Sequence, residues 1–213
     1  MVRAMRTCAA LLVGMTLLLP TSGHGELPEF GPPPVGASFD DIDDVTKQTD
    51  LTRQALAFLE TLHRHWGEGP ERLRTVLARS VEREEENSLV YLRNVHDHGL
   101  LEGYEFRKGS LARGRYVLIQ GPVNGLNEFI GYYAALKEAL TKLYGEPAAD
   151  QVIWSNDLYH HLPDYWGVAV MIGHLRYQAA WETAEGTLTL DLSGQQYSRL
   201  SLEYRVRGEV ADT

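Results

Sequence analysis

Residues 187–206 read TLTLDLSGQQYSRLSLEYRV, and this stretch decides the fold class. In its first part leucines alternate with polar residues, and the alternation resumes after the turn signal Ser193-Gly194. In the last part the apolar positions are Leu200, Leu202, Tyr204 and Val206, and the alternate positions are Arg199, Ser201, Glu203 and Arg205. A period of two is typical of antiparallel strands with one face toward a core and the other toward water. We therefore predict two antiparallel strands, Thr187–Leu192 and Tyr197–Val206.

The same kind of pattern predicts further strands earlier in the chain. Runs rich in Val, Leu, Ile and Tyr are separated by turn compositions at residues 96–99 and 108–110. The predicted strands are Ser88–Val95, Leu100–Arg107, Ala112–Gln120, Gln151–Ser155 and Arg176–Thr183. Pro163–Ile172 fits either a turn of helix or a strand, and the sequence leaves this choice open.

Three other stretches have the spacing of helices. Apolar residues from Leu51 to Trp66 fall on one helical face, which Gly67 and Gly69 end. Pro70 suits the first turn of a short second helix. The third helix runs from Ile130 to Tyr144, where Gly145 and then Pro147 give a strong stop signal.

These elements predict an α+β fold, an antiparallel sheet of about six to seven strands with helices packed on one face. The order is two helices, three strands, a helix and about four strands, which suggests two helix-then-meander units. No residue-level identity between the halves supports a repeat, so we predict a single domain over residues 44–208, followed by a tail at 209–213.

The N-terminus has the layout of a secretory signal peptide. Arg3 and Arg6 precede the apolar run Cys8–Leu19, which Pro20 ends before small residues. The run has about a dozen residues, whereas a membrane-spanning helix needs about 20. We predict cleavage after Gly23, giving a periplasmic or secreted protein with no stable membrane span after signal removal. Cleavage after Gly25 and an uncleaved anchor are the alternatives, and residues 24–43 form a Pro/Gly/Asp-rich linker.

Composition excludes several classes of function. The chain has 20 basic and 29 acidic residues, a net charge of −9, which argues against a nucleic-acid partner. The single cysteine, Cys8, lies in the predicted signal, so the mature chain lacks thiols for disulfides, zinc-thiolate sites or nucleophilic catalysis. Motifs for a nucleophile elbow, a zinc protease helix, a phosphate loop and a dinucleotide site are missing from the sequence. No cofactor and no metal site are predicted.

Three histidine pairs invite a test for metal binding. His63 and His65 lie two residues apart on a predicted helix and point about 200° from one another, so they cannot share an ion. His96 and His98 lie in a predicted turn with Asp97, where both rings could converge, but a third and a fourth ligand would have to come from elsewhere in the chain. His160 and His161 lie in an irregular segment with Asp157 and Asp164, and this is the best local cluster of polar groups. Asp40, Asp41, Asp43 and Asp44 are expected to form a solvated patch before the first helix, because they lack the pattern of a calcium loop.

Aromatic residues crowd the same region as that last pair. The chain has 11 tyrosines against five phenylalanines, and rings with polar ends can anchor interfaces or stack on sugars and peptides. The alternative is that these rings only cover the rim of the core. The candidate ligand-binding residues are Trp154, Tyr159, His160, His161, Tyr165 and Trp166.

Four short stretches carry a resemblance to known proteins. They are Tyr104–Leu111, Lys142–Pro147, Trp181–Thr183 and Leu202–Tyr204. Their layout resembles that of uncharacterised exported bacterial proteins, in which the sheet–helix–sheet order is similar to beta-lactamase-inhibitor-like α+β modules. The resemblance covers about residues 89–206 and implies a protein that acts through surfaces. It brings no catalytic residues that could be placed on this chain.

The sequence therefore predicts an exported, non-enzymatic binding or interaction protein of the bacterial envelope. Its partner would be another protein or an envelope polymer, and neither the ligand nor the oligomeric state follows from the sequence. The alternative is a hydrolase or a metal-dependent enzyme that uses the segment from Asp157 to Trp166. That alternative requires two or more of Asp157, His160, His161 and Asp164 to converge on one pocket.

Overall fold

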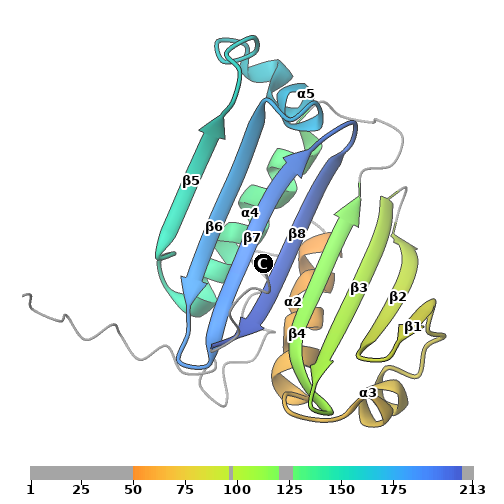
Figure 1. Ribbon diagram of the computed structural model, residues 1–213. Coiled ribbons are helices and arrows are strands. Elements are labelled where there is room, and N and C mark those ends of the chain that lie inside the picture. Colours follow the sequence, from red (N-terminus) through yellow and green to blue (C-terminus); the bar gives the residue numbers. More distant parts are fainter. Residues whose placement is uncertain (1–49, 96–97, 120–126, 208–213) are drawn as a thin grey trace, which may run out of the picture.

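The computed structural model describes residues 50–95, 98–119 and 127–207, and these form one antiparallel sheet with accompanying helices (Figure 1). The sheet has eight strands in the order β1-β2-β3-β4-β8-β7-β6-β5. The strands are β1 (Arg83–Glu85), β2 (Ser88–Val95), β3 (His98–Arg107), β4 (Ser110–Ile119), β5 (Ala149–Trp154), β6 (Leu175–Glu182), β7 (Gly186–Gly194) and β8 (Ser198–Val206). The helices are α2 (Asp50–Arg64), α3 (Pro70–Leu77), α4 (Glu128–Tyr144), the 3-10 turn η2 (Pro163–Tyr165) and α5 (Trp166–Met171).

The topology consists of two meanders that meet at the middle of the sheet. Strands β1 to β4 run inward from one edge, and strands β5 to β8 run inward from the other. The central pair β4–β8 is in register from Arg113↔Arg205 to Ile119↔Arg199. Helices α2 and α3 precede the first meander and α4 precedes the second. The repeat of helix and meander is therefore present in the topology, although the two halves differ in sequence.

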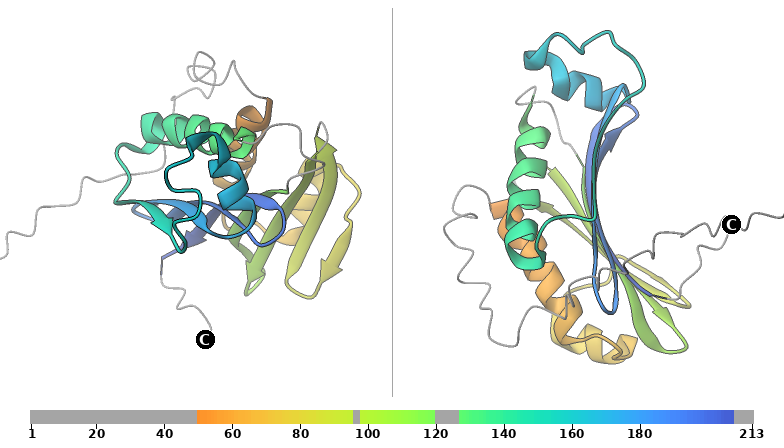
Figure 2. Two further views of the ribbon diagram at one scale, coloured as in Figure 1. Left: turned by 90° about the horizontal axis from the view of Figure 1, so that it is seen from above. Right: turned by 90° about the vertical axis from the view of Figure 1, so that its left-hand side faces the viewer.

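Two long helices lie beside one face of the sheet. Figure 2 shows α2 and α4 on the same side, and the two helices contact one another. Helix α2 packs on β4 at Gly114, where a Cβ atom would overlap with the side chain of Leu62. The buried residues of α2 and α4, such as Phe58 and Leu140, join those of both meanders in one apolar core. Burial of these apolar faces is the main favourable term that holds the helices on the sheet.

The opposite side of the sheet faces the viewer in Figure 1, and we call it the open face. Along β3, β6 and β8 the burial of residues alternates, and the less buried positions point to the open face. They are mainly polar or charged on β6, β7 and β8, and on β2 and β3 they include Leu92 and Leu101. Val117 of β4 continues this row of the register but is buried, with 8% of its surface exposed. The open face is thus polar on one half and partly apolar on the other.

Most elements confirm the sequence prediction, and the α+β class with an antiparallel sheet is confirmed. The predicted number of six to seven strands is wrong, because β1 is an eighth strand. Its three residues, Arg83–Glu85, are all charged and exposed, so no alternation of apolar residues signals it. The open choice at Pro163–Ile172 resolves to helix, and Gly173, with φ of +82°, follows its end.

Some predictions fall on residues outside the described part of the chain. They include the signal peptide with Cys8, the linker, the aspartates at 40–44, His96 and the tail at 209–213. Within the described ranges, no helix has the length and hydropathy that crossing a membrane requires.

Candidate functional site

The six candidate binding residues gather at one end of the sheet. The ring of Trp154, at the end of β5, lies 4.9 Å from that of His160 and 5.9 Å from that of Trp166, between centroids. The indole N–H of Trp166 donates to the carbonyl oxygen of His160 at 3.3 Å. Tyr159 stacks on Tyr165 at 6.2 Å, and the rings of His160 and His161 meet edge to face at 5.0 Å. The structure therefore brings these residues into one cluster, which we call the aromatic cluster.

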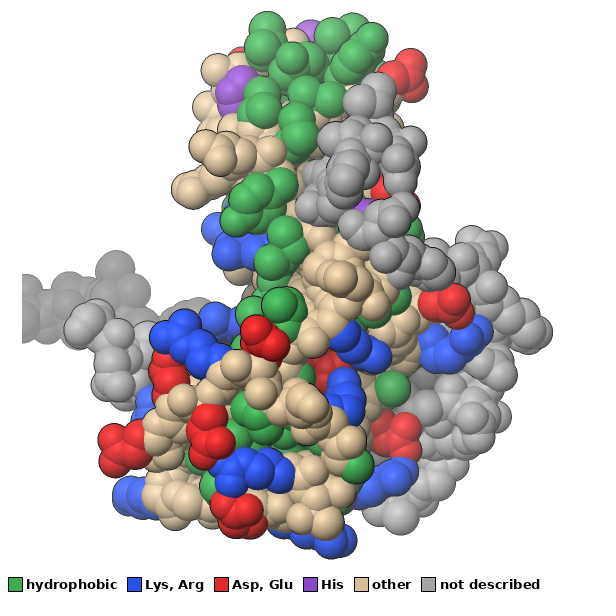
Figure 3. All heavy atoms as spheres, turned by 90° about the vertical axis from the view of Figure 1, so that its right-hand side faces the viewer, with side chains coloured by type: hydrophobic (Ala, Val, Ile, Leu, Met, Phe, Trp, Pro, Cys, Tyr) green, Lys and Arg blue, Asp and Glu red, His purple; other side chains and the backbone are tan. Residues whose placement is uncertain are grey.

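Exposed apolar side chains surround the aromatic cluster. Leu158 is 64% exposed, although large apolar side chains are usually buried. Others at this end of the molecule are Val152, Ile153, Leu162, Tyr165 and Ile172. Figure 3 shows hydrophobic side chains gathered at the top of the molecule, where α5 lies in Figure 1. A surface of this kind is typical of an interaction site.

The alternative of an enzyme at this segment finds little geometric support. Asp157, His160, His161 and Asp164 are all exposed. No side-chain hydrogen bond or ion pair within the described ranges joins either carboxylate to either imidazole. Cavities of about 510, 310 and 270 Å³ lie elsewhere on the molecule and are lined by other residues. The two carboxylates are therefore not held against the imidazoles in the way that acid–base catalysis or metal binding by this group requires.

The histidines His63, His65 and His98 have separate partners. His63 Nε2 lies 2.7 Å from the hydroxyl of Tyr144, whereas His65 Nδ1 lies 2.9 Å from Glu68. The two imidazoles thus point to different neighbours, although His65 lies in the turn just after α2 and not on the helix as predicted. His98 is buried on β3, not in a turn, with its Nε2 3.7 Å from a carboxylate oxygen of Glu128. Among the described residues no group of three His, Cys, Asp or Glu side chains could hold a metal ion.

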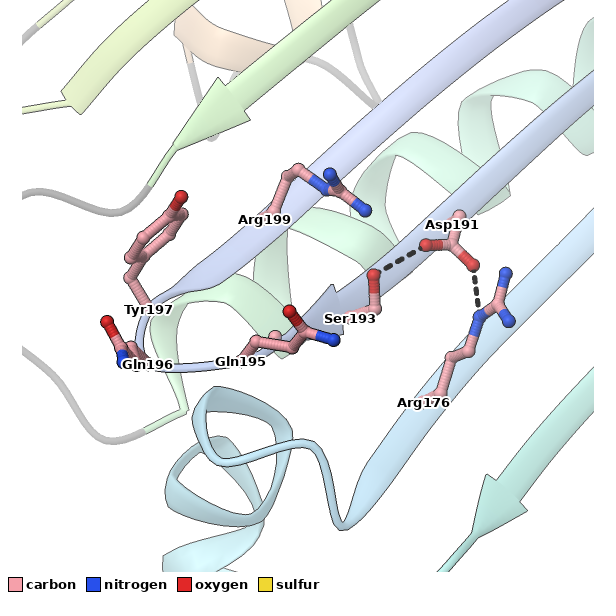
Figure 4. A pocket seen from close by; sticks show the side chains of 8 residues that line it. Arg176, Asp191, Ser193, Gln195, Gln196, Tyr197 and Arg199 are labelled. Atoms are coloured by element: carbon pink, nitrogen blue, oxygen red, sulfur yellow. Dashed lines mark hydrogen bonds and ion pairs between the residues drawn. The ribbon is translucent and has the colours of Figure 1, made fainter.

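A second feature, which sequence reasoning missed, lies on the open face of the sheet. Two cavities of about 510 Å³ and 310 Å³ share Arg176, Asp191 and Arg199, and together we call them the Arg groove. Figure 4 shows the residues that line the larger of these two cavities. At one end the groove is lined by the β7–β8 turn, Gly194–Tyr197. Toward the other end it reaches Arg115, Gln178, Thr189, Ser201 and Glu203. Its lining is dominated by hydrogen-bond donors.

The carboxylate of Asp191, which lines the groove, has hydrogen-bond partners within the protein. Asp191 accepts a hydrogen bond from Arg176 Nε at 2.5 Å through one carboxylate oxygen, and from the Ser193 hydroxyl at 2.8 Å through the other. Figure 4 shows the Asp191 side chain between these two partners. Within the described residues Arg176 makes no other side-chain hydrogen bond, so its two terminal nitrogens remain available. The charge of Asp191 is therefore compensated by Arg176 before any ligand arrives.

Arg199 differs from its neighbours because it has no partner among the described residues. It is exposed on β8, and it makes no hydrogen bond or ion pair within the part of the chain that the structure describes. A guanidinium offers five N–H donors and stays charged at any physiological pH. Arg199 thus gives the groove a cation that no described acid compensates.

The negative charge of Glu203, the second acidic residue that lines the groove, is also compensated by arginines. It accepts hydrogen bonds from Arg113 at 2.7 Å, Arg115 at 2.9 Å and Arg205 at 2.8 Å. Burial alone would raise the pKa of Glu203, but these hydrogen bonds and the nearby positive charges outweigh it and lower the pKa to about 2. Glu203 is therefore ionised at neutral pH and holds three arginines of the sheet in place.

The Arg groove and the aromatic cluster are physically joined. The backbone N–H of Gln196, in the β7–β8 turn, donates to the carbonyl oxygen of Met171 in α5 at 3.0 Å. At Gly194 a Cβ atom would overlap with the carbonyl oxygen of Val170, so only glycine lets the turn approach α5 this closely. The exposed ring of Tyr197 extends from the same turn. Both features therefore belong to one end of the molecule.

A partial signal for the groove is present in the sequence. The outward positions of β8, which include Arg199, Ser201 and Glu203, follow from the alternation of that strand. The pairing of Arg176 with Asp191 depends on the register of β6 against β7, which places Gln178 opposite Asp191. That register is not encoded in the local pattern of either strand.

Comparisons with family models, curated proteins and solved structures found no match to this chain. The likeness to beta-lactamase-inhibitor-like modules therefore stays a prediction from the sequence.

Proposed function

We propose that this chain is an exported, non-enzymatic binding protein of the bacterial envelope, and that the open face of its sheet is the binding surface. The observation that carries the proposal is the Arg groove, where Arg199 is exposed without a partner among the described residues and Arg176 keeps two nitrogens available. Donors on a rigid strand that no described acceptor occupies can bind a ligand without first breaking an internal contact.

The layout of the rest of the molecule supports a binding role. The β7–β8 turn fastens the groove to α5, so the exposed apolar side chains around the aromatic cluster adjoin the same surface. Arginine, tyrosine and tryptophan are the residue types that most often dominate binding energies. A ligand on the open face would thus meet charged donors first and aromatic or apolar groups at the end of the groove.

A paired capture experiment tests the binding surface. Ser201→Trp places a bulky side chain in the groove, and Ala134→Trp places the same side chain on the exposed side of α4. We expect components of an envelope fraction to be retained by the wild-type chain and by Ala134→Trp, and to be lost with Ser201→Trp. Identical sets of retained components for all three proteins would contradict the assignment of the open face.

The proposed export has its own test. Fractionation of cells that produce the full chain, followed by N-terminal sequencing, should recover a periplasmic or secreted protein that begins at His24. Recovery of the uncleaved chain in the cytosol would refute the envelope location.

A further inference from the structure

We infer that the open face binds an acidic peptide segment of a partner protein, with carboxylates in the Arg groove and apolar side chains on β2, β3 and β4. This inference rests on the proposed function and adds the chemistry of the ligand. It depends on the division of the open face into the Arg groove, which is its cationic half, and the area around Leu92 and Leu101, which is its apolar half. The strand register positions both.

The cationic half selects a ligand with negative charge. The groove holds Arg115, Arg176 and Arg199, and its two acids, Asp191 and Glu203, are already occupied by arginines and a serine. A ligand carboxylate at Arg199 would form charge-assisted hydrogen bonds without displacing a protein acid. Gln195, Gln196 and Tyr197 add neutral polar groups that can bond to a peptide backbone at the end of the groove.

The net charge of the whole chain does not oppose this choice. The chain carries −9, but the Debye length at physiological ionic strength is about 8 Å. Charges on the far side of the sheet are therefore largely screened, and a bound carboxylate responds to the guanidinium groups within a few ångströms. Local cations decide the affinity, and the acidic remainder of the surface lowers the rate of encounter.

The apolar half favours a peptide over other anionic ligands. One row of the register crosses the open face as Leu92↔Leu101↔Val117↔Ser201↔Asp191↔Gln178. Leu92 is 53% exposed and Leu101 is half-buried, whereas Val117, which lines the groove, is only 8% exposed. A phosphate polymer would leave this apolar half without contacts, whereas a peptide with acidic and apolar residues would cover both halves.

The test uses an array of 12-residue peptides in which the content of Glu and the content of Leu vary independently. The full chain is applied at low salt, as the wild type and as three variants. Arg199→Gln removes the exposed cation of the groove, Leu92→Ser removes an exposed apolar side chain, and Arg64→Gln makes the same charge change on α2, away from the open face. Arg199 and Leu92 are exposed, so neither substitution disturbs the core.

We expect the wild type to be retained most strongly by peptides that are rich in both Glu and Leu. Arg199→Gln should lower retention by Glu-rich peptides about tenfold, which corresponds to about 1.4 kcal/mol, and Leu92→Ser should reduce the dependence on Leu. Arg64→Gln should behave as the wild type does. Retention should weaken as salt increases, because the guanidinium groups are exposed.

Three results would overturn the inference. They are an equal loss for Arg64→Gln, retention that ignores Leu content, and no retention of any acidic peptide. If inorganic polyphosphate competes fully and Leu92→Ser has no effect, the ligand is an anionic polymer instead of a peptide. In each of these cases the capture experiment with Ser201→Trp would still test whether the open face binds a ligand. Failure of the inference and failure of the proposed function are therefore distinguishable.

Discussion

Glu203 shows how one half-buried carboxylate organises the open face. It bonds to three arginines from β4 and β8, and its pKa is lowered to about 2 from an ordinary value of 4.5. Because the folded state holds this group ionised, its stabilisation is complete above pH 4.5 and is lost as the pH falls toward 2.

We therefore expect the free energy of unfolding to fall by about 2–3 kcal/mol between about pH 5 and pH 2 through Glu203 alone. Glu203→Gln should be less stable at about pH 5 and should show a shallower decline. Urea denaturation at several pH values measures both slopes. Parallel slopes for the two proteins would show that the arginines do not stabilise the ionised form.

His63 predicts a second dependence on pH, in a different range. Burial lowers the pKa of this histidine below its ordinary value of 6.5, and the ring contacts Tyr144 and Tyr204. The unfolded chain binds a proton more readily than the folded one, so stability is present above pH 6.5 and declines as the pH falls below it. His63→Gln should flatten the decline in the midpoint of urea unfolding, and a decline as steep as that of the wild type would contradict this role of His63.

The β7–β8 turn is the element on which the groove and the aromatic cluster both depend. Gly194→Ala would force a Cβ atom against backbone carbonyl oxygens of α5, which cannot move as a flexible side chain can. We expect a loss of about 1–3 kcal/mol in the free energy of unfolding, together with weaker retention of acidic peptides.

The matched control for that substitution is Gly131→Ala. Gly131 lies on the exposed side of α4, and a Cβ atom there meets nothing within 4 Å. Alanine should stabilise the helix by up to about 1 kcal/mol, which gives a shift of opposite sign in the thermal midpoint. If the thermal midpoints of both variants shift in the same direction, the close packing of the turn on α5 is not the reason that residue 194 must be glycine.

The elements that the sequence predicted are those with a local signal. The alternation of β8 and the helical spacing before Gly145 both survive in the structure. Strand β1 was missed, since three charged residues pair with β2 without burying a side chain. The aromatic cluster was predicted because its members are close in sequence. The Arg groove was not, because Arg176 and Arg199 meet only through the register of three strands.

Both meanders share one core, although each is preceded by its own helix. The core cluster includes Phe58 and Tyr104 from the first half and Trp181 and Leu190 from the second. The β4–β8 ladder joins the halves by backbone pairing, and Tyr204 of β8 contacts His63 and Trp66 from the first half. Separating the halves would expose this core and the inner edge of each meander, so neither should unfold alone.

We therefore expect one cooperative unfolding transition for the whole molecule. Trp66→Phe leaves the tryptophan fluorescence to Trp154, Trp166 and Trp181, all in the second half, while far-ultraviolet circular dichroism reports both halves. The two signals should give the same urea midpoint, and Gly114→Ala, which disturbs α2 on β4, should shift them together. A fluorescence midpoint that stays fixed while the dichroism midpoint falls would mean that the second half holds its fold without the first, and that the β4–β8 ladder does not couple them.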